Sequence, residues 1–89
     1  MPSMKCYEFN NGGGVTFGVV ADSMASACLF AASDMDEDCD EYKVRLLPEK
    51  EAKAREITDE EDGRKQSIHA WVAEGNGSTG AYMLWHSEA

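Results

Sequence analysis

The sequence predicts an α+β domain: a single antiparallel β-sheet of about five strands, with one or two helices packed on one face. Short alternating runs of β-branched and aromatic residues recur along the chain, and two stretches of helix-forming residues separate them. Most of the connections are short, which favours antiparallel neighbours in the sheet. The expected order is β-β-α-β-(α)-β-β. The 89 residues fit one domain, residues 1–89.

A β-hairpin is expected at the start of the chain. Residues 4–9 alternate and contain aromatic side chains, and residues 15–21 are β-branched and apolar. The run Asn10-Asn11-Gly12-Gly13-Gly14 between them tolerates positive φ angles. These features predict two paired strands joined by a tight turn.

A helix is expected over residues 24–32, after the N-cap candidates Asp22 and Ser23. Its face toward the sheet would carry the residues at helical spacing, Met24, Ala27, Cys28 and Ala31. The acidic run 34–41 begins where this helix should end. Because acidic side chains oppose the dipole at a helix C-terminus, we expect this run to be a solvated loop.

The second half should add three strands. Residues 42–47 alternate and are stopped by Pro48, and residues 49–56 form a short exposed helix with opposite charges three and four apart. An acidic turn is expected over 58–63.

Strands four and five are expected over 66–74 and 81–86, and a glycine-rich hairpin loop, 75–80, would connect them. The predicted buried face carries Val15, Phe17, Val19, Val44, Leu46, Ile68, Ala70, Val72, Tyr82 and Leu84. The opposite face would carry Trp71, Met83 and Trp85. A contact between Trp71 and Trp85 across neighbouring strands has two interpretations, ordinary packing or a surface for a partner.

Composition excludes several classes of protein. With 43% hydrophobic and 28% charged residues, the chain is not intrinsically disordered. The longest apolar stretch, 27–32, is far shorter than the ~18 residues of a membrane span. The first residues contain no apolar signal segment, so the expected location is the cytoplasm of the cell that makes the protein. The three cysteines, an odd number without a Cys-x-x-Cys pair, predict reduced thiols.

Three patterns that resemble chemical motifs do not meet the requirements of those motifs. The glycines of 75–80 match a dinucleotide fingerprint by letter, but the residues that follow predict a strand where the mechanism needs a helix. The run 34–38 resembles the opening of a calcium loop, yet Cys39 stands at the glycine position and Arg45 at the glutamate position. No local signature supports a nucleophilic pair such as Cys28 with His69. We therefore expect no enzyme, no cofactor and no metal.

Charge is the feature that departs most from an ordinary domain. The formal net charge is −9, and ten of the acids lie in two clusters, residues 34–41 and 59–62. This field disfavours direct binding to nucleic acid or to an anionic membrane. Two interpretations remain: the acids keep the protein soluble and monomeric, or they imitate a nucleic-acid strand and attract a basic surface.

The whole layout resembles the small anti-CRISPR inhibitor proteins of phages and mobile elements. The resemblance is in size, in the hairpin with Asn10-Asn11-Gly12-Gly13-Gly14, in the strand that runs through Ala21-Asp22-Ser23 into a small-residue helix, and in the concentrated acids. It implies a phage protein that acts in a bacterial host cell, by protein–protein interaction on a CRISPR effector or another protein–RNA complex.

We therefore expect a non-enzymatic inhibitor that docks an acidic surface on a basic nucleic-acid-binding surface, with Tyr42 or Trp85 as apolar anchors. The predicted partner-binding residues are Asp34, Asp36, Glu37, Asp38, Asp40, Glu41, Tyr42, Asp59, Glu60, Glu61, Asp62 and Trp85. The alternative is a small structural or assembly module that acts by self-association or by pairing an edge strand with a partner. Both a monomer and a dimer are compatible with the sequence.

Overall fold

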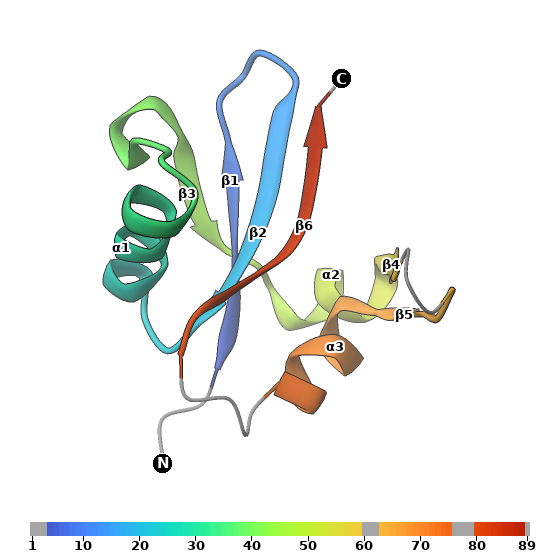
Figure 1. Ribbon diagram of the computed structural model, residues 1–89. Helices are drawn as coiled ribbons and strands as arrows, with labels where there is room; N and C mark the ends of the chain where they lie inside the picture. Colours follow the sequence, from blue (N-terminus) through green and yellow to red (C-terminus); the bar gives the residue numbers. More distant parts are fainter. Residues whose placement is uncertain (1–3, 60–62, 76–79, 89) are drawn as a thin grey trace.

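The α+β class and the antiparallel sheet are confirmed by a computed structural model that describes residues 4–59, 63–75 and 80–88 (Figure 1). The main sheet has four strands in the order β3-β1-β2-β6, and β4 and β5 form a separate two-stranded sheet. The elements of the described residues are β1 (Lys5–Asn10), β2 (Val15–Ala21), α1 (Met24–Asp34), the 3-10 helix η1 (Cys39–Glu41), β3 (Lys43–Leu46), α2 (Glu49–Ala54), β4 (Glu56–Thr58), β5 (Lys65–Ser67), α3 (Ile68–Gly75) and β6 (Tyr82–Glu88).

The expected hairpin forms between β1 and β2, which pair in antiparallel register. The side chains of Asn10 and Asn11 accept hydrogen bonds from the backbone N–H groups of Gly12 and Gly13, at 2.8 and 2.7 Å. Gly12 and Gly14 adopt φ angles of 78° and 102°, which a residue with a side chain rarely adopts. The turn chemistry predicted from the sequence is therefore the chemistry that closes the hairpin.

Helix α1 begins where the sequence predicts. The Ser23 hydroxyl accepts the N–H of Ser26 at 3.1 Å, which is an N-cap. The helix continues past the expected end to Asp34. Ala27 and Ala31 are fully buried, and their small side chains allow the helix to lie close to the sheet. The core on this side, the α1-side core, consists of Tyr7, Phe9, Phe17, Val19, Ala21, Ala27 and Ala31.

A second core lies on the other face of the sheet, so the helices cover both faces and not one. Side chains alternate along β1, so Tyr7 and Phe9 face α1 while Cys6 faces α2 and α3. We call this second cluster the α2–α3-side core. It consists of the buried residues Cys6, Leu47, Ala52 and Ile68, with Ile57, Val72, Leu84 and Trp85 packed against them.

The strand expected over residues 66–74 is wrong. Lys65–Ser67 is a short strand that pairs with β4, and Ile68–Gly75 is helix α3. The Ser67 hydroxyl accepts the backbone N–H of Ala70 at 3.1 Å and so begins the helix. The hairpin loop expected over 75–80 therefore follows a helix and not a strand: Gly75 ends α3, and residues 76–79 lie outside the described residues. The expected acidic turn starts later than predicted, since Thr58 belongs to β4.

Strand β6 is confirmed, but its faces differ from the prediction. The register with β2 shifts between Gly18 and Val19, which pair with Trp85 and Met83 and leave Leu84 as an extra residue. This bulge turns Leu84 and Trp85 toward the same core, whereas the alternating pattern placed them on opposite faces. Leu46, expected to be buried, is 46% exposed because β3 is an edge strand.

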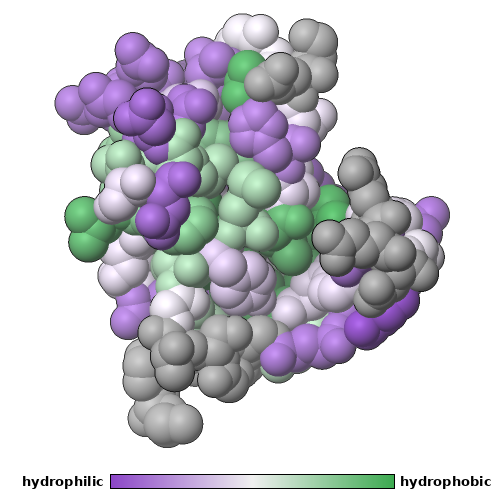
Figure 2. Space-filling view, viewed as in Figure 1, coloured by the Kyte–Doolittle hydropathy of each residue, from purple (hydrophilic) through white to green (hydrophobic). Residues whose placement is uncertain are grey.

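Figure 2 shows hydrophilic side chains gathered over the end of α1 and η1, at the upper left, and over β5, at the lower right. Apolar side chains fill the area between them. Of the helices described, none is both long and apolar enough to cross a membrane.

Candidate functional site

The acidic segment 34–41 is an ordered turn beside the edge strand β3, and not an open loop throughout. Asp34 is the last residue of α1, and Asp36 takes a positive φ of 57°, which turns the chain back. The N–H of Glu37 then donates to the carbonyl of Ala31 at 2.8 Å. Because Asp is one of the few residue types that tolerate this φ, the same residue supplies both the turn and a charge.

Helix η1 completes the segment. The side chain of Asp38 accepts the N–H of Asp40 at 3.0 Å and begins the short helix. Asp40 and Glu41 are exposed on it. A local hydrogen bond therefore holds η1 in place while the carboxylates of its own residues point to water.

Two contacts attach this segment to the α1-side core. The Tyr42 hydroxyl donates to Glu37 at 2.7 Å, and the Tyr42 ring packs edge-on against Phe17 at 5.1 Å between centroids. The Cys39 thiol donates to the sulfur of Cys28 in α1 at 2.8 Å. Tyr42 is thus half-buried in the body of the protein, next to the acids that it was expected to accompany.

The carboxylates of this segment have no cationic partner. Within residues 34–41, all of which are described, no side chain forms an ion pair with a lysine or arginine. Five of the six acids are exposed, and Glu37 is partly exposed. We call this surface, Asp34, Asp36, Glu37, Asp38, Asp40 and Glu41, the acidic patch.

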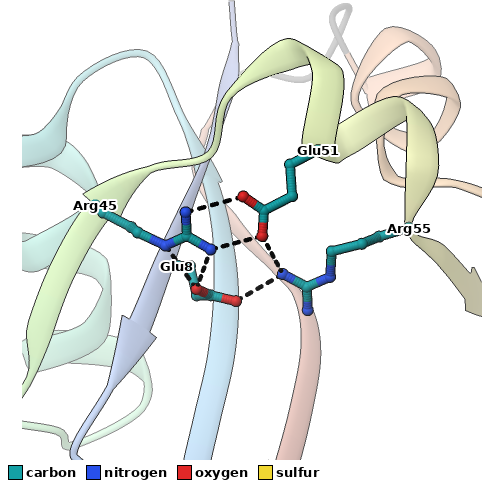
Figure 3. A network of polar contacts seen from close by, with 4 residues as sticks. All are labelled: Glu8, Arg45, Glu51 and Arg55. Carbon is teal, nitrogen blue, oxygen red and sulfur yellow. Dashed lines mark hydrogen bonds and ion pairs between the residues drawn. The ribbon is translucent and has the colours of Figure 1, made fainter.

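The arginines are paired with other acids. Arg45 of β3 and Arg55, which follows α2, both donate to Glu8 of β1, at 2.8 and 2.7 Å (Figure 3). Arg45 also forms a two-bond contact with Glu51 at 2.7 and 2.9 Å. Burial raises the pKa of Glu8, but the hydrogen bonds from Arg55 and Arg45 outweigh it and hold that pKa below its ordinary value. This network ties β1, β3 and α2 together.

A cleft of about 510 Å³ lies at the opposite edge of the main sheet, between β6 and the second sheet. Its lining residues are Ile57, Thr58, Asp59, Trp71, Tyr82, Met83, Leu84, Trp85 and His86. The Trp71 indole donates to the carbonyl of Ile57 at 3.0 Å, which holds α3 against β4. Arg64 lies over the Trp71 ring and Arg55 over the Trp85 ring, at 5.2 and 5.0 Å from the centroids. We call this site the β6 cleft.

The predicted partner-binding residues therefore divide between two places. Residues 34–42 lie together beside β3, whereas Asp59 and Trp85 line the β6 cleft across the sheet. Glu60, Glu61 and Asp62 lie outside the described residues. The cleft was missed because Trp71 was assigned to a strand. The cap at Ser67 is the signal that would have placed Trp71 on a helix.

Residues that could support catalysis are dispersed. Among the described residues, no three histidine, cysteine or acidic side chains are placed to hold a metal ion. Cys28 contacts Cys39 and not His69, which lies 3.5 Å from Glu49 on the surface. His86 stacks on Phe17 at 5.8 Å.

Comparisons with protein-family models, with curated proteins and with solved structures found no match to this chain.

Proposed function

We propose that this protein is a non-enzymatic inhibitor that binds, through the acidic patch, a basic surface of a protein or protein–RNA complex that handles nucleic acid. One observation carries the proposal: the six acids of the patch have no cationic partner among the described residues, while the arginines pair with Glu8, Glu51 and Glu74. If the acids of the patch served only to stabilise the fold, we would expect them to form ion pairs with those arginines.

The charge density of the patch suits a groove built for nucleic acid. Eight extended residues would span at most about 28 Å. Part of this segment is helical, so its carboxylates occupy a shorter length. A single nucleic-acid strand carries about one phosphate per 3.4 Å. The patch therefore offers a basic groove a comparable density of negative charge, and binding would release the counterions of both surfaces.

The partner class is a basic nucleic-acid-binding complex, and a CRISPR effector is the candidate that the resemblance in layout implies. The Tyr42–Glu37 hydrogen bond and the Cys39–Cys28 contact support the proposal, because both hold the patch in one shape before binding. A surface ordered in advance loses less entropy when it docks.

The test uses two variants with the same change of charge. Asp40→Asn with Glu41→Gln removes two exposed charges from the patch, and neither side chain forms a hydrogen bond that orders the segment. Asp22→Asn with Glu56→Gln removes two exposed charges elsewhere and serves as the control. Tagged protein captures its partner from bacterial lysate, with elution by rising salt and by competing DNA or RNA. The purified partner is then tested for nucleic-acid binding and cleavage.

We expect the patch variant to bind the partner about tenfold more weakly, or ~1.4 kcal/mol, with a shallower salt dependence. The control variant should bind and inhibit as the parent protein does. Equal binding by both variants, or a partner whose binding is insensitive to salt and to nucleic acid, would refute the proposal.

A further inference from the structure

The two edges of the main sheet differ in how they are protected. Strand β3 has four residues, among them Lys43 and Arg45, and Pro48 follows it closely. Lysine, proline and short length are features that prevent a sheet edge from pairing with another chain. Strand β6 has seven residues and contains no lysine, arginine or proline. Its one protective feature is the bulge at Leu84.

Strand β6 also has a cleft along its open side. Within the described part of the chain, its sheet neighbour is β2 alone. Five successive residues of β6 line the β6 cleft, together with Ile57, Thr58, Asp59 and Trp71 from the second sheet and α3. An additional strand paired with β6 would direct every second side chain toward this apolar and aromatic lining. Figure 2 shows apolar groups between β6 and the second sheet.

We propose that β6 and the β6 cleft form a peptide-binding site, which accepts an extended segment of a partner protein as a fifth strand of the main sheet. The segment would alternate basic with apolar residues. Its main chain would pair with β6, its apolar side chains would contact Trp71 and Trp85, and its basic side chains would stay in water near Asp59.

Charge selects a basic segment over an acidic one. Among the described residues of the lining, Asp59 is the one acid, and none of them is a lysine or arginine. The arginines that lie on the two indole rings are paired, Arg55 with Glu8 and Arg64 with Glu74. The whole chain carries a net charge of −9, which attracts a basic segment and repels an acidic one.

A second copy of the chain fits this edge less well. Pairing of β6 with its own copy about a two-fold axis would bring both second sheets to the same face. Figure 1 shows β4 and β5 extending beyond β6 on the side away from β2. Both second sheets would then have to fit on one face beside the paired strands. A single extended segment needs only the space between β6 and β4.

This inference is independent of the proposed function, because the acidic patch lies at the β3 edge, across the sheet from β6. The probe is a fluorescein-labelled peptide of alternating lysine and valine. Two further forms are N-methylated, one at every lysine amide and one at every valine amide. Successive N–H groups of a strand point to opposite sides, so strand addition tolerates one methylated form and not the other.

We expect the lysine–valine peptide to bind, and one methylated form to bind at least tenfold more weakly than the other. A peptide with glutamate in place of lysine should not bind. Asp59→Lys should weaken binding about tenfold, while the matched charge change Asp22→Lys, at an exposed position outside the patch and the cleft, should have little effect. Chemical-shift changes should concentrate at β6 and Trp71.

Four results would overturn the inference. Equal binding of both methylated peptides would show attraction by charge alone. Equal loss from Asp59→Lys and Asp22→Lys would remove the assignment to the cleft. Absence of binding at millimolar peptide would show that the β6 edge does not accept such a segment. A dimer in sedimentation that Met83→Lys dissociates would assign the β6 edge to self-association.

Discussion

The indole ring of Trp85 occupies the space that a side chain at Gly18 would need. The two residues face each other across β2 and β6, and a Cβ atom at position 18 would lie 2.0 Å from a ring carbon of Trp85. Gly18 therefore allows Trp85 to lie directly on the backbone of β2, between the sheet and Arg55, whose guanidinium carbon is 5.0 Å from the ring centroid.

Gly18→Ala should destabilise the fold by about 1–3 kcal/mol, because Trp85 would have to move within a packed core. Gly80→Ala is the control, since no atom lies within 4 Å of the Cβ position there. Urea denaturation of both variants checks the prediction. Equal stability of the two would contradict the close approach of Trp85 to β2.

Glu8→Gln should lower the free energy of unfolding by about 2 kcal/mol, since the side chain accepts hydrogen bonds from Arg45 and Arg55 and is only 12% exposed. Glutamine keeps the shape but removes the charge that holds both arginines. The comparison is Glu49→Gln, whose ion pair with Lys53 is exposed and should leave stability nearly unchanged. Thermal and urea unfolding of the two variants should separate them clearly.

Glu8 should also make stability sensitive to acid. Its pKa is lowered in the folded protein by Arg55 and Arg45, against the effect of burial, and is near 4.5 when the chain is unfolded. The stabilising effect is therefore present above pH 4.5 and is lost as the pH falls through the folded pKa. Between pH 6 and pH 3 the parent protein should lose more stability than Glu8→Gln. Parallel pH profiles of urea midpoints would contradict this.

Cys28 and Cys39 should form an intramolecular disulfide when diamide is added, because their sulfur atoms already lie 2.8 Å apart. Burial raises the pKa of Cys28 to about 11, with smaller contributions from the shared hydrogen bond and charge of Cys39 and from the charge of Asp40. Alkylation of Cys28 should therefore be slow at pH 8 and accelerate as the pH rises toward that pKa. Mass spectrometry of digests locates the bond. Cys39→Ser is the control, and a disulfide to the buried Cys6 would contradict the geometry.

The hairpin, helix α1, β3, α2 and β6 were all predictable, since each has a local signal in the chain. The Asn-Gly run closes the turn, Ser23 caps α1, and Pro48 follows β3. Such signals act over a few residues and so can be recognised without knowing what the segment contacts. The acidic patch was recognisable for the same reason, because its charges are consecutive.

Helix α3 was missed because its pattern fits two periods. Ile68 and Val72 are four positions apart in the chain. This spacing places both residues on one face of a strand and equally on one face of a helix. β-branched and aromatic content favoured the strand. The helix is stabilised by the burial of Ile68 in the α2–α3-side core and by the cap from Ser67. Of these two features, only the cap can be recognised from the sequence.

Composition and local patterning alone were enough for the class of fold, most of its elements and the position of the concentrated charge. Long-range pairing was needed for the rest: the order β3-β1-β2-β6 separates the acidic patch from Trp85, and the bulge opposite Gly18 turns Leu84 and Trp85 to one side. The physical reason is that strand order and register depend on contacts between residues far apart in the chain, and alternation along one strand cannot show which neighbour it will meet.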